Sequence, residues 1–261
     1  MYFSDRRGRK IYYESHGLTE GDALPLVLLH HGFGSLVIWE KIRARLVAAG
    51  RRVILYDRPG HGRSEMGGDF DDYCRRDDFR SENVALLEEL AGLLGLELFH
   101  LVGQCEGGVT AVDYAAAFPG RVRTLTTSST LCCSREPMAD FNRKHFPATF
   151  AELEPEMREK MFHWHGPGCA AAFYDRLWSH GGAYGQGYFD LREKLRRVAC
   201  PALVLYPDRS SLFEVEQGVE FYRRLPAGEL AVLPKCGHNT YEQQPEEYVR
   251  QLLGFIGRHS G

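Results

Sequence analysis

The sequence predicts an α/β fold in which helices cover a mostly parallel sheet. Short apolar runs alternate with helical patterns along the chain, which is typical of this class. The run at residues 24–30, Leu-Pro-Leu-Val-Leu-Leu-His, is almost continuously apolar, as expected of a strand buried on both faces. The length of 261 residues suits one large domain that buries a core without disulfides or metal.

Each element has its own signal in the sequence. An opening strand pair is expected at residues 1–3 and 10–14, and we interpret the basic turn between them (Arg6, Arg7, Arg9 and Lys10) as solvated. Further strands are predicted at residues 24–30, 52–56, 98–103, 121–128, 202–206 and 229–233. Helices are predicted at residues 37–49, 81–94, 109–118, 215–224 and 245–256.

Residues 131–187 break this alternation, because they hold few strand-like runs and many aromatic side chains. We interpret this segment as a helical cap inserted between two strands, over a core formed by residues 1–130 and 188–261. The alternative is an ordinary helical excursion that packs on its own core. The chain shows no internal repeat and no linker, so one domain with an inserted cap is the simplest prediction.

Composition excludes several classes of partner and cofactor. The net charge of −3 gives no reason to expect nucleic acid, and the absence of a run of about 18 apolar residues argues against a membrane span. The chain start lacks the features of a signal peptide, and an odd number of scattered cysteines indicates the reducing cytoplasm. We expect no metal, since His163 and His165 diverge and the Cys132-Cys133 pair lacks a zinc spacing. No phosphate-binding or dinucleotide motif is present, so no cofactor is predicted.

The strongest local signal joins a predicted strand to a predicted helix through the run Gly103-Gln104-Cys105-Glu106-Gly107-Gly108. A tight turn of this kind needs small residues around its central side chain. Cys105 would lie at the head of a helix, where we expect the helix dipole to lower the thiol pKa and favour the thiolate. The alternative is a buried structural cysteine in a glycine-rich turn.

With this motif and three others in order, the chain resembles the α/β-hydrolase superfamily, most members of which carry serine at the position of Cys105. The other motifs are His30-His31-Gly32-Phe33-Gly34-Ser35, the loop at residues 57–64, and the Gly237-His238 pair after the last predicted strand. The resemblance implies an α/β-hydrolase fold with an eight-stranded, mostly parallel sheet and a helical cap inserted after strand 6.

The same resemblance assigns roles to individual residues. Cys105 would be the nucleophile and His238 the general base. The backbone N–H groups of Phe33 and Glu106 would form the oxyanion hole. His61, in the loop at residues 57–64, is assigned no chemistry.

The acid of the triad departs from the family pattern. The family places it after the strand at residues 202–206, and in that register Ser210 occupies the acid position. Asp208 is the earlier aspartate of the motif, and we take it as the predicted acid if its loop is shifted. Two alternatives remain open. The acid could be Glu136 or Asp140 after the preceding strand, or Ser210 could simply hydrogen-bond His238 and leave a Cys-His dyad.

The predicted function is hydrolysis of a carboxylic ester, lactone or thioester through an acyl-enzyme on Cys105. Cysteine-bearing relatives include dienelactone hydrolases and polyhydroxyalkanoate synthases, and the aromatic cap suggests an apolar or aromatic acyl substrate. One alternative is acyl transfer by the same chemistry. Another is a non-catalytic small-molecule-binding homologue, because both Cys105 and Ser210 depart from the usual residues. The sequence also allows a cysteine introduced in place of serine, and it leaves the oligomeric state open.

Overall fold

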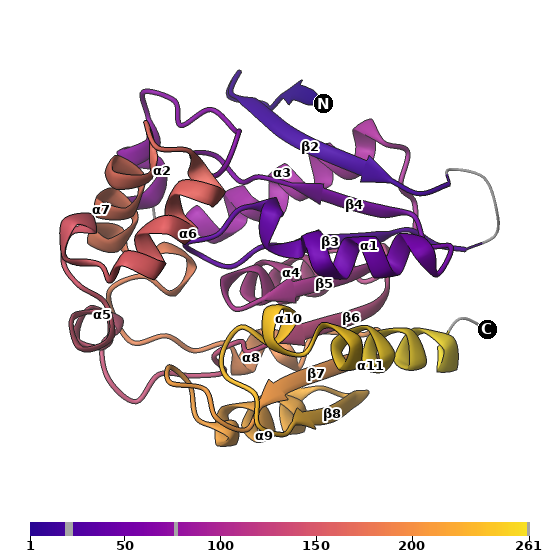
Figure 1. The fold of residues 1–261 in the computed structure, drawn as a ribbon. Helices are drawn as coiled ribbons and strands as arrows, with labels where there is room; N and C mark the ends of the chain where they lie inside the picture. The colour runs from indigo at the N-terminus through magenta and orange to yellow at the C-terminus, as the bar shows by residue number, and fades with distance from the viewer. Residues whose placement is uncertain (19–22, 76–77, 260–261) are drawn as a thin grey trace.

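The structure is a computed structural model that describes residues 1–18, 23–75 and 78–259. The described residues form one eight-stranded sheet in the order β1-β2-β4-β3-β5-β6-β7-β8 (Figure 1). Strand β2 pairs antiparallel with β1 on one side and with β4 on the other, and the remaining neighbours are parallel. The predicted mostly parallel sheet is therefore confirmed.

The strands place the site at the centre of the sheet. Their bounds are β1 Tyr2–Ser4, β2 Lys10–His16, β3 Leu26–Leu29, β4 Val53–Tyr56, β5 Phe99–Gln104, β6 Val122–Ser128, β7 Ala202–Pro207 and β8 Gly228–Leu233. Strands β3, β4, β5 and β7 are buried along their whole length, which explains their continuous apolar runs. Because β5 lies between β3 and β6, the loops that follow these strands meet at one edge of the sheet.

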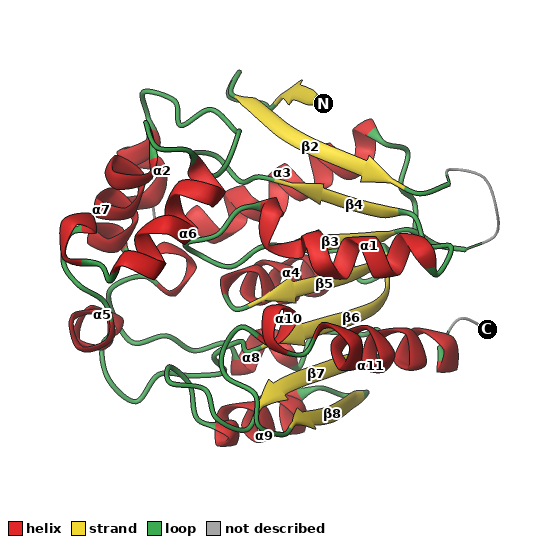
Figure 2. Cartoon of the chain, viewed as in Figure 1, coloured by secondary structure: helices red, strands yellow, loops and turns green. Residues whose placement is uncertain are grey.

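Helices flank both faces of the sheet (Figure 2). Their bounds are α1 Glu40–Ala48, α2 Phe70–Arg75, α3 Phe79–Leu93, α4 Glu106–Ala117, α5 Met138–His145, α6 Pro155–His165, α7 Ala170–His180, α8 Arg192–Leu195, α9 Val215–Arg224, α10 Thr240–Gln243 and α11 Pro245–Arg258. The described residues also form three short 3₁₀ turns: η1 Leu36–Trp39, η2 Phe150–Glu152 and η3 Gly182–Tyr184. Helices α1 and α11 pack together on the near face in Figure 1, and α3 and α4 pack together behind it.

The sequence missed some of these elements. Helix α2 is only six residues long, too short to show a helical period. Helix α4 begins at Glu106, three residues before the predicted start, because the strand-to-helix turn is completed at a single residue, Cys105.

The segment at residues 131–187 is helical, as its composition indicated. It contains α5, α6, α7 and two 3₁₀ turns, and α6 and α7 lie beyond the strand ends on the left of Figure 1. Met161, Phe173 and Leu177 are buried in it. The division into a core and a cap at these boundaries stays a prediction.

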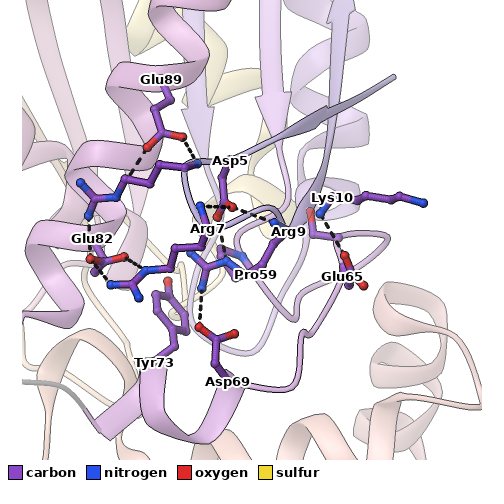
Figure 3. A network of polar contacts seen from close by, with 12 residues as sticks. Asp5, Arg7, Arg9, Lys10, Pro59, Glu65, Asp69, Tyr73, Glu82 and Glu89 are labelled. Atoms are coloured by element: carbon purple, nitrogen blue, oxygen red, sulfur yellow. Dashed lines mark hydrogen bonds and ion pairs between the residues drawn. The ribbon is translucent and has the colours of Figure 1, made fainter.

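The interpretation of the basic turn as solvated is wrong for Arg9, whereas Arg7 is exposed but paired with an acid (Figure 3). Arg9 is buried, and its Nε lies 2.7 Å from a carboxylate oxygen of Asp5. Arg7 donates two hydrogen bonds, of 2.8 and 2.7 Å, to the Glu82 carboxylate of α3. Glu82 lies 75 residues further along the chain, so the sequence offered no sign that this acid would meet the turn.

Within the described part of the chain, no helix is both long and apolar enough to cross a membrane. The same residues contain no cluster of three or more His, Cys, Asp or Glu side chains that could hold a metal ion. The seven cysteines are all free thiols.

Candidate active site

Cys105 lies at the sharp turn between β5 and α4. Its backbone has φ 52° and ψ −116°, a conformation that costs a non-glycine residue strain energy. The flanking glycines leave no room for side chains. A Cβ atom on Gly103 would lie 2.3 Å from the carbonyl oxygen of Gly107, and one on Gly107 would lie 2.3 Å from the carbonyl oxygen of Leu29. Close backbone approach therefore explains the glycines on both sides of Cys105.

The Cys105 thiol is buried and has two polar neighbours. Its Sγ lies 3.5 Å from the hydroxyl of Tyr184, and the backbone N–H of Glu106 donates to it. Burial raises the pKa of the Cys105 thiol to about 12, although both hydrogen bonds oppose this shift. The expectation that the helix dipole would favour the thiolate is wrong, because desolvation outweighs the dipole and the hydrogen bonds at this depth.

The predicted oxyanion-hole residues lie at the same cavity as the thiol. Phe33, Glu106 and Cys105 all line it, together with His238. The structure thus brings these four sequence-predicted residues to one space, from loops after β3, β5 and β8.

The side chain of Glu106 connects three parts of the site, a role that the sequence did not reveal. Its buried carboxylate lies 3.3 Å from Arg58 Nη1 and accepts the backbone N–H of Ala183. Cβ atoms on Gly32 and Gly182 would lie 2.6 and 2.3 Å from Glu106 Oε1, so both glycines are needed to admit it. Burial raises the pKa of Glu106, and Arg58 opposes that rise. This carboxylate holds the loop after β4, through Arg58, and the η3 turn against the start of α4.

His238 lies in the loop after β8 and is held by its backbone. Its carbonyl oxygen accepts hydrogen bonds from Gln104 Nε2 at 2.9 Å and Ser129 Oγ at 2.7 Å. The ring of Phe213 packs edge-on at 5.5 Å between centroids. Desolvation lowers the pKa of the His238 imidazole to about 4, so the ring is neutral at pH 7. The sequence did not point to Gln104 or Ser129, because each comes from a different strand end.

Ser210, not Asp208, meets the histidine. Ser210 Oγ lies 3.2 Å from His238 Nδ1. Asp208 is exposed, and its carboxylate accepts the backbone N–H of Cys236 at 3.0 Å. This N–H is the main cause that lowers the pKa of Asp208. The Asp208 backbone is tied to β8 through Leu233, 3.1 Å away, so its side chain braces the histidine loop and does not reach the ring.

The alternative acids after β6 also have other partners. Glu136 pairs with Lys144, and Asp140 pairs with Arg143. The structure therefore brings neither carboxylate to His238, and Ser210 is the partner that it shows.

The hydroxyl of Ser210 is a weaker hydrogen-bond partner for His238 than a carboxylate would be. Its oxygen already accepts the backbone N–H groups of Leu212 at 3.2 Å and Phe213 at 3.1 Å. A serine hydroxyl has two acceptor lone pairs and one donor hydrogen, so it can either donate that hydrogen to Nδ1 or accept the Nδ1 N–H on a lone pair that it shares with these groups, depending on the tautomer of the ring. A carboxylate at this position would accept from Nδ1 and stabilise the charged imidazolium.

The cavity has a volume of about 410 Å³ and a mostly apolar lining. The apolar side chains that line it are Phe33, Met138, Phe141, Phe146, Leu153, Met157, Trp164, Leu177, Trp178, Tyr184, Leu212 and Phe213. Most of them come from residues 131–187. The polar lining includes His31, Asn142, His145, Lys160 and Asn239.

His165 of α6 ties the helical segment to two core loops. Its Nδ1 accepts the backbone N–H of Gly62 at 3.0 Å, and its Nε2 donates to the carbonyl oxygen of Phe33 at 2.7 Å. The ring stacks on Phe173 with 4.1 Å between centroids, and burial lowers its pKa to about 4. Since the Phe33 loop carries a predicted oxyanion donor, His165 helps to position that loop. The sequence raised this histidine only in connection with a metal site.

A profile described as "Alpha/beta hydrolase family" matches residues 26–251, most of the chain. The chain belongs to this family. This match supports the predicted fold independently of the structure, and the family is one of hydrolases.

Individual relatives are distant and differ from one another in activity. The chain is 24% identical to a proline iminopeptidase of Lactobacillus crispatus, over 97% of this chain and 96% of the relative. It is 26% identical to 2-hydroxy-6-oxononadienedioate/2-hydroxy-6-oxononatrienedioate hydrolase 1 of Dechloromonas aromatica, over 90% and 88%. Among solved structures, the enol-lactonase of Burkholderia xenovorans superposes with a TM-score of 0.76 at 20% identity, over 98% of this chain and all of that one. These likenesses support the fold and the hydrolase class without naming a substrate.

Proposed function

We propose that this protein hydrolyses a carboxylic ester, a lactone or a thioester through an acyl-enzyme on Cys105. The observation that carries the proposal is the position of the Cys105 thiol. It lies at the strained head of α4, on the same cavity as His238 and Phe33, with the Glu106 N–H directed at it. A strained residue at a cavity is a common mark of a reactive group.

The proposed reaction needs no group beyond these residues and water. His238 removes the thiol proton while Sγ attacks the acyl carbon, so the C–S bond forms and the carbonyl electron pair moves to oxygen. The N–H groups of Phe33 and Glu106 stabilise that oxyanion. The intermediate collapses, the leaving group takes the proton from His238, and the acyl group stays on sulfur. Water then attacks with His238 as base, the C–S bond breaks, His238 returns the proton to sulfur, and the acid departs.

Both reacting groups, the Cys105 thiol and the His238 imidazole, are neutral in the resting site. The pKa of the Cys105 thiol is raised to about 12 and that of His238 is lowered to about 4, so at pH 7 neither is charged. The resting pair is therefore neutral, and the proton must move to His238 before or during the attack. Ser210 offers the resulting imidazolium a dipole in place of a carboxylate charge, and we expect slow acylation for this reason.

The cavity lining supports an apolar or aromatic acyl group as substrate. Aromatic side chains such as Phe146, Trp164 and Phe213 surround the space next to the thiol. A volume of about 410 Å³ accommodates a small organic acyl group.

The first test is intact-protein mass spectrometry after mixing the protein with aryl esters, lactones, acyl thioesters and small polar esters. We expect a transient adduct of acyl mass on Cys105 that Cys105→Ala lacks and that the exposed-thiol control Cys169→Ala retains. Repeating the reaction with an added amine or alcohol separates hydrolysis from acyl transfer. Equal turnover of small polar and aromatic esters would contradict the substrate class.

A non-catalytic binding protein is the second candidate, and one observation favours it. If Ser210 donates to Nδ1 of His238, the ring proton lies on Nε2, and that nitrogen cannot accept a proton from the thiol. Under this alternative, the ligand binds reversibly, no adduct forms on Cys105, and the recovered ligand is unchanged.

A further inference from the structure

Tyr184 places a hydroxyl group directly at the sulfur of Cys105. The residue ends the η3 turn and is buried, and its Oη lies 3.5 Å from Cys105 Sγ. Its ring packs edge-on against Phe189 at 4.8 Å and Phe213 at 5.8 Å between centroids. These contacts on both sides hold the hydroxyl in place.

The direction of this hydrogen bond follows from the other partner of the hydroxyl. The backbone N–H of Leu131 donates to Tyr184 Oη at 3.4 Å and takes part of its acceptor capacity. The phenolic hydrogen is available to Cys105 Sγ, and once the sulfur is a thiolate only the phenol can donate in this pair. Burial also raises the pKa of Tyr184 well above its ordinary value, so the hydroxyl keeps its proton and can act only by donating it in a hydrogen bond.

We propose that Tyr184 is a catalytic residue that donates a hydrogen bond to the Cys105 thiolate as this forms and as it leaves. The inference rests on the proposed acyl-enzyme function. No proton passes from Tyr184: the thiol proton moves to His238 and on to the leaving group, and sulfur regains a proton from the attacking water through His238 when the acyl group departs. The phenol O–H solvates the negative sulfur in both steps, while the Glu106 N–H contacts the resting sulfur and turns to the oxyanion once the C–S bond forms.

This donor compensates for the missing carboxylate. In the usual triad an acid stabilises the positive imidazolium, whereas here Ser210 supplies only a hydroxyl. A hydrogen-bond donor at sulfur stabilises the thiolate, which is the negative member of the same ion pair, and so lowers the free energy of that pair.

The position of Tyr184 also makes the nucleophile depend on the segment between β6 and β7. The preceding residue, Ala183, donates its N–H to the Glu106 carboxylate, which fixes η3 against the start of α4. With η3 in this position, the Tyr184 hydroxyl is available as a second hydrogen-bond donor to the thiolate.

The test is the rate at which iodoacetamide alkylates Cys105 between pH 6 and 11, followed by peptide mass spectrometry in the wild type, Tyr184→Phe and Tyr188→Phe. We expect Tyr184→Phe to displace the curve by about one pH unit, a roughly tenfold lower rate at each pH below the midpoint. The exposed control Tyr188→Phe should follow the wild type. Removing one oxygen opens the site to the reagent, so a lower rate cannot come from reduced access.

An unchanged alkylation curve in Tyr184→Phe, with the fold intact by circular dichroism, overturns the proposal. If that variant fails to fold, 3-fluorotyrosine at position 184 provides a second test. Its more acidic hydroxyl is a stronger donor and should raise the alkylation rate, and no increase contradicts the proposal. Alkylation does not require acyl transfer. A displaced curve without an acyl adduct in the wild type rejects the proposed function alone, whereas an adduct with an undisplaced curve rejects the role of Tyr184 alone.

Discussion

The cysteine half of the candidate site is built from backbone geometry, whereas the histidine half depends on side-chain hydroxyl groups. Around Cys105, two glycines permit contacts at which a Cβ atom would lie 2.3 Å from a carbonyl oxygen. Around His238, the hydroxyls of Ser129 and Ser210 hold the backbone carbonyl and the ring nitrogen. We therefore expect the glycines of the cysteine half to tolerate almost no substitution, whereas single hydroxyl groups of the histidine half can be replaced.

The largest expected effect tests the rigidity of the cysteine half. In Gly107→Ala the new Cβ meets the Leu29 carbonyl oxygen of β3, so we expect the free energy of unfolding to fall by about 3 kcal/mol or more. Urea unfolding followed by circular dichroism measures this. The control is Gly92→Ala on α3, where no atom lies within 4 Å of the added Cβ, and a gain of up to about 1 kcal/mol is expected there. Equal midpoints for the two variants would refute the steric account.

The second-largest expected effect tests the role of Ser210 beside His238. In Ser210→Asp, the N–H groups of Leu212 and Phe213 can hold the new carboxylate beside His238 Nδ1. We expect acylation of Cys105 to accelerate on the order of 10- to 100-fold, because a charge then stabilises the imidazolium. Rapid-quench mass spectrometry gives the rate constant.

Asp208→Asn is the matched control for that variant, because Asp208 braces the Cys236 N–H and does not contact the ring. Its acylation rate should stay within about twofold of the wild type, the margin expected away from the reacting atoms. A large loss in Asp208→Asn would return the acid role to Asp208, and no gain in Ser210→Asp would contradict the account given for Ser210.

The smallest expected effect concerns the histidine that joins the helical segment to both halves. Burial lowers the pKa of His165 from 6.5 to about 4. Between these values the unfolded chain binds the extra proton, so stability falls as the pH drops from 7 to 5. Between pH 7 and 5, we expect the free energy of unfolding of His165→Gln to fall by about 2 kcal/mol less than that of the wild type. Urea unfolding at both pH values measures it, and the exposed His163→Gln should retain the full decline.

The sequence predicted the repeating parts of the molecule better than the junctions between them. Strands such as β3 and β4 were recognisable because burial on both faces requires continuous apolar runs. The turn at Cys105 was recognisable because its glycines are local in sequence. The burial of Arg9 and the raised pKa of the Cys105 thiol were not predicted, because each depends on packing that only the folded chain creates.

The sequence by itself determined the α/β architecture, the motif order and the residues that meet at the cavity, because these follow from local periodicity and short-range sterics. The roles of Cys105, His238 and the oxyanion donors stay predictions. Only the tertiary structure decided which side chains complete the site. Ser210 faces the ring, Asp208 turns away, and Tyr184 reaches the sulfur from 79 residues further along the chain. Such partners are set by how separate loops pack at one sheet edge, and no spacing within a single segment encodes them.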